Sequence, residues 1–484
     1  MNDQRDYTRK ILHTFEQISQ VPRASKKEQK IAEWLLNWAA DHGLEARSDA
    51  ALNIVIDVPA SGGYENAETL VLQGHMDMVC EKTRESSHDF DHDPIELVYR
   101  DDGWLTANRT TLGADNGIAL AMALVAADDD QLGHPRLELL FTTDEETGLT
   151  GANALEPGFI HGKQLLNIDS EDEGVFTIGC SGGEDARVAL PFAADEALPG
   201  YRAARLTATG MSGGHSGIDI VYERANAIKL LFGCIHSISL QCDVRIATVS
   251  GGTSRNAIPR DAEAVLLIPE ADFAAMQDHV AAFAGKRQAE YAGTDPGLRL
   301  TLEADAGRHQ AASAEATRRV IDTVLVFPHG IDAMSKDIEG LVETSNNLAR
   351  IDVKNGALEL LSNQRSSNMD SLSALGERIL SVARLAGAEG QLNGSYTAWH
   401  PDPDSALLAR CVAVYENLFG AKPTVEAIHA GLECGIIGSK YPGMEMISFG
   451  PTIRNPHSPD EKIDIDSIGK VWAFMAALFE SYKD

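Results

Sequence analysis

The chain has 484 residues, with 41 Lys or Arg and 72 Asp or Glu, and its formal net charge is −31. Charged residues make up 23% and apolar residues 44%, as in ordinary globular proteins with real cores. This composition excludes general disorder. The acidity argues against nucleic acid and against anionic membrane surfaces, because both require clustered Lys and Arg. The length predicts two or three domains.

The chain carries no readable targeting segment. Its first residues lack a basic stretch followed by a long apolar one, so no signal peptide is expected. No run approaches the roughly 18 apolar residues that a membrane helix needs. The six cysteines are scattered without a CxxC pair, which is typical of reduced thiols. We therefore expect a soluble, cytoplasmic protein.

The first part of the chain alternates between predicted helices and strands. Helical apolar spacing covers 7–42, and a further helix is expected over 117–127. Short apolar runs bounded by Gly, Asp or Pro predict strands over 53–58, 69–73, 137–142 and 164–168. This alternation is typical of an α/β sheet with a parallel component.

From about residue 184 the pattern becomes that of an α+β domain. Strands are expected over 186–192, 202–209, 244–249 and 261–268, and helices over 225–235 and 273–292. A similar alternation over 299–390 suggests two related halves. The end returns to the α/β pattern, with helices over 406–418 and 467–482 and an apolar run over 444–449. We therefore expect one domain over 1–183 and 395–484, interrupted by an inserted domain over 184–394.

Four segments share one pattern, in which an apolar run or a helix start meets acidic residues or histidine. Their polar residues are His75 and Asp77, Asp115, Glu145 and Glu146, and Asp169. Because the carboxyl ends of strands line the crevice of open α/β sheets, these side chains can converge. Only His, Asp and Glu recur, without a thiolate pair. That set favours zinc, manganese or cobalt over a structural Cys-rich zinc site.

Each segment alone has an ordinary structural explanation. His75 would be a core or loop histidine, Asp115 a helix N-cap, the paired glutamates a solvated face and Asp169 a turn residue. The recurrence of all four favours a site instead. His75 and Asp77 lie two apart on a strand and share a face, so Asp77 can orient the imidazole. A metal-activated water with a carboxylate base would make a hydrolase active at neutral pH.

The motifs resemble those of a known family, the dinuclear-zinc metallopeptidases that include carnosinases, peptidase V, succinyl-diaminopimelate desuccinylase and glutamate carboxypeptidases. They are GHMD (74–77), GADNG (113–117), TTDEETG (142–148), NIDSED (167–172), GHSG (214–217), GGTSRNAIPR (251–260) and NPHSPDEKIDI (455–465). Within the family, ETSNNLA (343–349), LSNQRSS (361–367) and HAGLECG (429–435) most resemble the bacterial aminoacyl-histidine dipeptidase branch. The resemblance implies a zinc-peptidase-like mixed sheet flanked by helices, which is the catalytic domain, with a large inserted α+β lid domain.

The resemblance also implies two zinc ions per chain, with cobalt or manganese as substitutes. The implied ligands are His75, Asp115, Glu146, Asp169 and His457. Asp115 would bridge the ions, with one histidine and one further carboxylate on each. Glu145 would be the general base that takes a proton from a bridging water, and Asp77 would be the carboxylate behind His75.

Further residues are expected to act on a peptide substrate. His215, in a flexible Gly-rich turn, could donate to the developing oxyanion. Asn256 resembles a lid asparagine that contacts substrate, and Arg365 could bind a C-terminal carboxylate bidentately, which would select short peptides. His429 and Glu433 flank Gly431, and Glu433 would receive the substrate ammonium. The ordinary alternatives are a loop histidine, a turn asparagine and a surface arginine.

The leading hypothesis is a dipeptidase that cleaves unblocked dipeptides, Xaa-His among them. The alternative enzyme is an N-acyl-amino-acid amidohydrolase with the same dinuclear site. A non-catalytic metal- or peptide-binding relative is a third hypothesis, disfavoured because Glu145 and every expected ligand are present. The partner is a small peptide, with no nucleic acid or membrane. The sequence leaves open whether lid domains pair in a homodimer or one chain supplies both halves, and whose active site His215 serves.

Overall fold

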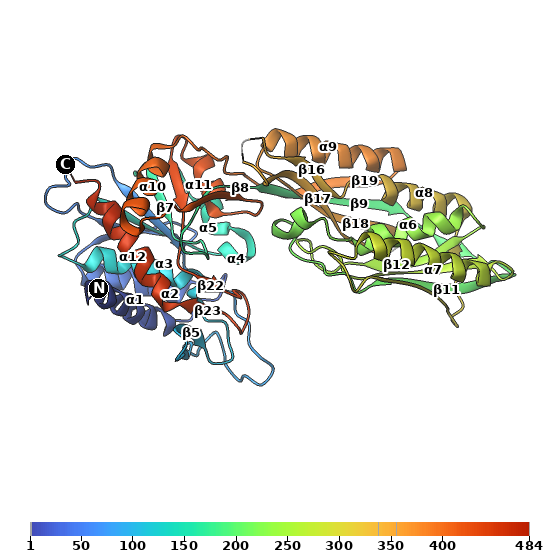
Figure 1. Cartoon of the computed structure of the whole chain (residues 1–484), viewed down its shortest axis with the longest axis horizontal. Coiled ribbons are helices and arrows are strands. Elements are labelled where there is room, and N and C mark those ends of the chain that lie inside the picture. Colours follow the sequence, from blue (N-terminus) through green and yellow to red (C-terminus); the bar gives the residue numbers. More distant parts are fainter. Residues whose placement is uncertain (1, 337, 355, 484) are drawn as a thin grey trace. The chain divides into compact units, whose positions relative to one another are not determined.

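The computed structural model describes residues 2–336, 338–354 and 356–483. The chain forms two compact units (Figure 1). Unit 1 comprises Met1–Cys180, Trp399–Ala427 and Leu432–Asp484, and unit 2 comprises Ser181–Ala398 and Ile428–Gly431. Within the described residues, no helix combines the length and apolarity needed to cross a membrane.

Unit 1 contains helices and two sheets. Its helices are α1 (Asn2–Ser19), α2 (Gln29–Asp41), α3 (Ala114–Asp128), α4 (Glu145–Gly148), α5 (Thr150–Ala154), α10 (Ala406–Phe419), α11 (Glu433–Lys440) and α12 (Ile465–Glu480). Its larger sheet contains β1 (Glu45–Ser48), β2 (Ile54–Val58), β3 (Leu70–His75), β6 (Leu137–Thr142), β7 (Gln164–Asn167), β8 (Val175–Cys180), β20 (Thr424–Ile428) and β21 (Glu445–Ser448). The smaller contains β4 (Leu97–Tyr99), β5 (Trp104–Ala107), β22 (Ile453–Arg454) and β23 (Lys462–Asp464).

The larger sheet is mixed, as the sequence predicts. In the described part of the chain its order is β1-β2-β6-β3-β7-β21-β8-β20. Strands β6, β3, β7 and β21 are parallel neighbours, whereas β1, β2 and β8 pair antiparallel. His75 pairs with Thr142, and Gln73 with Asn167. The carboxyl ends of β3, β6 and β7 therefore meet at one edge, where the acidic residues follow.

The core of unit 1 packs α1, α2, α3, α10 and α12 against one face of this sheet. Helix α3 is apolar and buried nearly throughout, which is typical of a helix enclosed on all sides. It packs closely on β3 because Gly74 has no side chain. A Cβ at Gly74 would lie 2.7 Å from the Cβ of Ala119. This close approach brings the start of α3, with Asp115, beside the end of β3.

Unit 2 is an α+β unit. Its helices are α6 (Ala227–Ser239), α7 (Phe273–Glu290), α8 (Ala314–Val326), α9 (Met369–Ala386) and the 3-10 turn η1 (Ile218–Tyr222). Its strands are β9 (Gly182–Pro191), β10 (Ala194–Glu196), β11 (Tyr201–Thr209), β12 (Arg245–Gly251), β13 (Ala262–Pro269), β14 (Arg299–Ala304), β15 (Ala311–Ala312), β16 (Gly330–Met334), β17 (Val342–Lys354), β18 (Ala357–Ser366) and β19 (Glu389–Tyr396).

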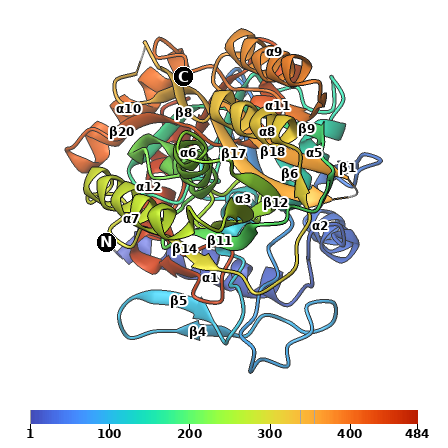
Figure 2. The same ribbon diagram turned by 90° about the vertical axis from the view of Figure 1, so that its right-hand side faces the viewer.

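The main sheet of unit 2 joins two groups of strands. Among the described residues its order is β14-β11-β13-β12-β17-β18-β9-β19, with β16 also on β17. The groups meet where Ser250 and Gly251 of β12 pair with Asp352 and Ile351 of β17. Helices α6 to α9 lie side by side over the sheet (Figure 2), and their apolar faces form one core with it.

Candidate active site

The implied metal ligands of unit 1 come from the ends of neighbouring elements. His75 is the last residue of β3, and Asp169 follows β7. Asp115 lies in the first turn of α3, and Glu146 in α4, which follows β6. His457 lies in the loop between β22 and β23, in the left-handed region with φ of 59°. A left-handed histidine is uncommon, and such conformations cluster at functional sites.

Asp115 lies between two sets of side chains. Its Oδ1 is 3.1 Å from His75 Nε2, and its Oδ2 is 3.1 Å from His457 Nε2. Asp169 Oδ1 is 3.5 Å from His75 Nε2, and Glu146 Oε2 is 3.1 Å from His457 Nε2. Two sets of possible ligand atoms, each within 4.8 Å of one another, therefore share the Asp115 carboxylate.

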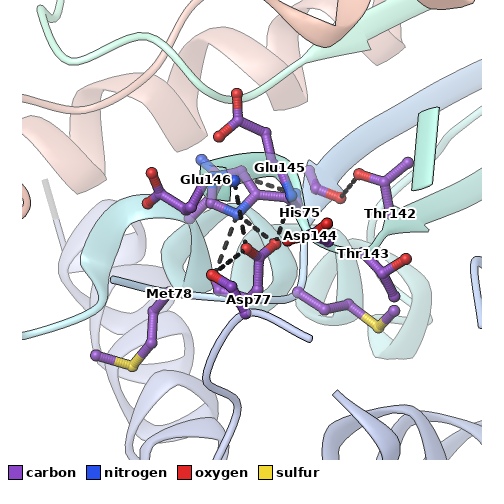
Figure 3. Close-up of polar contacts among 12 residues, drawn as sticks. His75, Asp77, Met78, Thr142, Thr143, Asp144, Glu145 and Glu146 are labelled. Atoms are coloured by element: carbon purple, nitrogen blue, oxygen red, sulfur yellow. Dashed lines mark hydrogen bonds and ion pairs between the residues drawn. The ribbon is translucent and has the colours of Figure 1, made fainter. Parts of the chain in front are cut away.

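Asp77 organises the residues around His75 (Figure 3). His75 Nδ1 lies 3.1 Å from the main-chain carbonyl of Asp77 and 3.4 Å from its carboxylate. With Nδ1 donating, Nε2 is free to bind a cation. The Asp77 carboxylate also accepts the Ser25 hydroxyl at 2.8 Å and the backbone N–H groups of Glu145 and Glu146 at 3.0 and 3.3 Å.

The site is strongly acidic. Burial lowers the pKa of His75, but the neighbouring carboxylates, Asp169 foremost, raise it well above its ordinary value. Hydrogen bonds to Asp115 and Glu146 raise the pKa of His457 to about 11. Burial raises the pKa of Asp169 to about 6 and that of Glu145 well above its usual range. The cluster of carboxylates therefore favours the binding of positively charged groups between them.

The donor set fits metal ions. Each set offers one imidazole nitrogen and carboxylate oxygens, which suit zinc, manganese or cobalt. Glu146 Oε1 is buried and has no hydrogen-bond partner among the described residues, so it has an unused acceptor at the site. Glu145 also lies within 4.8 Å of His75 and Glu146, close enough to act on a group held there.

Four of the expected substrate contacts form a separate cluster in unit 2. The bridge between His215 and Ala257 places Asn256 beside His215, and Ser216 N–H donates to the Asn256 carbonyl at 2.8 Å. Arg365, on β18, and His429 are each only 6% exposed. Arg365 Nη1 donates to the Tyr396 hydroxyl at 3.0 Å, and within the described part of the chain its buried Nε has no partner.

The histidines of this cluster stay neutral near pH 7. Nδ1 of His215 accepts the N–H groups of Gly217 and Ile218 at 3.3 and 3.1 Å, so its proton resides on Nε2. Burial and the Arg365 charge lower the pKa of His215 to about 4 and that of His429 to about 3. His429 Nε2 is 2.8 Å from the Ser345 hydroxyl, and its buried Nδ1 has no partner in the residues that the structure describes. The cluster offers donors without adding imidazolium charge.

The expected contact of Glu433 with a substrate ammonium stays a prediction. Its side chain is fully buried in unit 1, at the start of α11. It accepts hydrogen bonds from Gln73 at 2.7 Å and from the Thr142 hydroxyl at 2.6 Å. Burial raises its pKa to about 7. The carboxylate links α11 to β3 and β6.

Sequence reasoning missed three residues that support the site. Asn116 accepts the His75 N–H at 3.3 Å and donates to the Ile168 carbonyl at 2.8 Å, which ties β3 to the end of β7. Arg23 and Glu461 are buried against the loop that carries Asp115. Asn116 and Glu461 stand inside recognised motifs, but Arg23 has no local signal.

A family model described as peptidase family M20/M25/M40 matches residues 71–481. The chain belongs to this family. It is therefore a peptidase by class, and its mixed α/β fold with a metal-type site is that of a metallopeptidase.

Two relatives are similar over almost the whole chain. The cytosol non-specific dipeptidase of Escherichia coli (strain K12) is 36% identical over 466 residues, covering 96% of each chain. The crystal structure of aminoacylhistidine dipeptidase from Vibrio alginolyticus has a TM-score of 0.89 at 38% identity, covering 97% of this chain and 96% of that one. The crystal structure of aminopeptidase PepT from Bacillus cereus has a TM-score of 0.57 at 16% identity, covering 99% of each chain, and shows similarity of the fold alone.

Proposed function

We propose that the protein is a dipeptidase that hydrolyses the peptide bond of unblocked dipeptides, Xaa-His among them, with two zinc ions and Glu145 as general base. The observation that carries the proposal is the Asp115 carboxylate, whose two oxygens each face a different histidine at 3.1 Å. Similarity to two dipeptidases, at 36% and 38% identity over nearly the whole chain, supports this substrate class.

The residues of unit 1 have distinct roles in the proposed reaction. His75, Asp115 and Asp169 would hold one ion. Asp115, Glu146 and His457 would hold the other. Bound zinc supplies a water activated at neutral pH and polarises the scissile carbonyl. Glu145 takes a proton from the attacking water and returns it to the leaving amine.

The cluster of unit 2 supplies substrate recognition in this proposal. His215 Nε2–H donates to the oxyanion that develops on the scissile carbonyl. Arg365 binds the free C-terminal carboxylate, since its buried Nε has no partner in the described chain and guanidinium pairs well with carboxylate. Asn256 and His429 make further polar contacts with the substrate. A carboxylate anchor close to the scissile bond selects very short peptides.

The location and assembly of the protein are also proposals. The Escherichia coli relative is named a cytosol enzyme, which supports a cytoplasmic location for this chain. The net charge of −31 supports a protein that binds neither nucleic acid nor anionic membranes. We propose a homodimer through unit 2 over a monomer that supplies both halves itself, and sedimentation of the purified chain tests it.

The test is metal content and alanyl-histidine hydrolysis on one purified sample, before and after chelation. We expect about two zinc ions per chain, with hydrolysis lost on chelation and restored by added metal. N-acetyl-alanyl-histidine serves as the blocked control and should be cleaved poorly. Bound metal with hydrolysis of N-acyl amino acids alone would favour the deacylase. Absence of both metal and hydrolysis would contradict the proposal.

A further inference from the structure

The buried carboxylate of Glu461 binds the loop that carries Asp115. Its Oε2 accepts the backbone N–H groups of Leu112 and Gly113 at 2.8 and 3.0 Å. Its Oε1 accepts those of Ala114 and Asp115 at 2.8 and 3.3 Å. Four successive N–H groups therefore converge on one side chain that is only 2% exposed.

This contact covers the start of α3 from a distant part of the chain, where Asp115 and Asn116 depart from helical backbone angles. The first N–H groups of a helix have no partner within the helix, and a side chain at the N-cap usually binds one of them. Gly113 stands at the N-cap of α3, with φ of 69°, and has no side chain to offer. Glu461, 348 residues further along the chain than Gly113, supplies the missing acceptors.

Glu461 belongs to the loop that carries His457. Its own N–H donates to the Ser458 carbonyl at 3.0 Å, and the Ser458 hydroxyl donates to the Asn455 carbonyl at 2.9 Å. The Thr106 hydroxyl donates to the Glu461 carbonyl at 2.8 Å, which anchors this loop to β5. Glu461 thus connects the backbone around His457 directly with the backbone of Asp115.

Arg23 connects the same loop with the strand end that carries His75. Its Nη1 donates to the main-chain carbonyls of Met76 and Asp77, both at 3.1 Å, and its Nη2 donates to the Gly113 carbonyl. Like Glu461, Arg23 is 2% exposed. A Cβ at Gly117 would lie 2.6 Å from Arg23 Nη2, so this glycine leaves room for the guanidinium.

We propose that Glu461, with Arg23 as its partner, is a positioning residue that holds Asp115 in place between His75 and His457 before metal binds. This inference rests on the proposed function, because it concerns the same two-metal site. A shared carboxylate must present its oxygens in two directions at once, and Gly113, two residues before Asp115, leaves this segment few restraints of its own. The four N–H bonds and the guanidinium contacts supply those restraints. Without them, metal binding would have to order the loop, and affinity would fall.

A purely structural role is the competing explanation, and the chain offers a matched control for it. Glu138 is another fully buried carboxylate of unit 1. It accepts the backbone N–H groups of His161 and Gly162 at 2.8 Å each and lies 3.4 Å from Arg47. It stands near the start of β6, at the opposite end of that strand from Glu145. Glu138→Gln should therefore lower stability without changing the metal site.

The experiment compares Glu461→Gln, Glu138→Gln and the unchanged chain. Zinc affinity is measured by competition with a fluorescent chelator, site geometry by the visible absorption of the cobalt-loaded protein, and stability by the thermal midpoint of the metal-free protein. We expect Glu461→Gln to bind zinc about 10- to 100-fold more weakly and to change the cobalt spectrum. Glu138→Gln should keep the affinity and the spectrum of the unchanged chain while its thermal midpoint falls.

The opposite result would overturn the inference. If Glu461→Gln lowers the thermal midpoint as Glu138→Gln does, but keeps affinity and spectrum, Glu461 is structural only. If Glu461→Gln fails to fold, Glu461→Asp and Arg23→Lys replace it, because each keeps the charge but changes the length or shape of the side chain. Unchanged zinc affinity in both variants would also overturn the inference. If the unchanged chain binds no zinc, both the proposed function and this inference fail. If that chain binds zinc and cleaves dipeptide, a negative result removes only the positioning role.

Discussion

The Asp77 carboxylate accepts the backbone N–H of Glu145 at 3.0 Å, although the two residues are 68 positions apart. The same carboxylate lies 3.4 Å from His75 Nδ1. One buried side chain therefore orients a candidate metal ligand and fixes the start of the helix that carries the candidate base. An error in its placement would move both functional groups together.

Asp77→Asn is expected to weaken metal binding. An asparagine amide cannot accept hydrogen bonds through both of its ends, so one of the N–H groups at Glu145 and Glu146 loses its acceptor. We expect a loss of about 1–3 kcal/mol in the free energy of unfolding and about 10- to 100-fold weaker zinc binding. Calorimetry and chelator competition measure both. Unchanged affinity would show that Asp77 does not orient His75.

Glu145→Gln is expected to separate chemistry from metal binding. The amide keeps the size of the side chain but cannot take a proton, so turnover of alanyl-histidine should fall by about 10²- to 10⁴-fold. The metal content, measured by mass spectrometry of the purified protein, should stay as in the unchanged chain. Near-normal turnover with full metal content would contradict the role of general base.

Arg365→Ala is expected to impair only substrates with a free carboxylate. A charge-assisted hydrogen bond contributes about 1.5–3 kcal/mol, so kcat/KM for alanyl-histidine should fall by about 10- to 150-fold. For the C-terminal amide of the same dipeptide, kcat/KM should fall far less. Arg350→Ala is the control, because Arg350 is partly exposed and pairs with Asp352. An equal loss for acid and amide would argue against a carboxylate contact.

His215→Asn is expected to lower kcat without shifting the acidic limb of the pH profile. The asparagine oxygen can still accept the N–H groups of Gly217 and Ile218, but the donor at Nε2 is gone, which should lower kcat about 10²- to 10³-fold. Because the pKa of His215 is lowered to about 4, its imidazole is already neutral between pH 5.5 and 8. Movement of that limb in the variant would show that His215 titrates during catalysis.

His134→Gln is expected to reduce the decrease in the free energy of unfolding between pH 7 and pH 5. His134 is 6% exposed, and burial lowers its pKa below the ordinary value of 6.5. As pH falls below about 6.5, the unfolded chain binds a proton that the folded chain does not, so the free energy of unfolding falls. Urea unfolding at pH 7 and pH 5 measures the difference, with His13→Gln on the exposed face of α1 as the control. An equal decrease in all three proteins would contradict the expectation.

Local sequence predicts most of the elements around the site. The strand expected over 137–142 is β6 with the same bounds, and the run over 164–168 is β7 less its last residue. The range of α3 begins at Ala114, before the expected residue 117, but Asp115 and Asn116 have non-helical backbone angles, so the regular helix begins where the sequence predicts. Glu461, from another part of the chain, binds the N–H groups of the residues that precede it. Helix signals of short range cannot include such a contact.

The amino-acid order by itself determined the strands, the acidic residues at their ends and the metal-type donor set, because run length, burial pattern and ligand chemistry are local properties. Tertiary structure alone decided that Asp115 lies between His75 and His457, and that Arg23 and Glu461 hold its loop. It also decided that Glu433 is buried and bonded to Gln73 and Thr142. These relationships depend on strand register and on contacts across hundreds of residues, and no local pattern records which distant groups will meet.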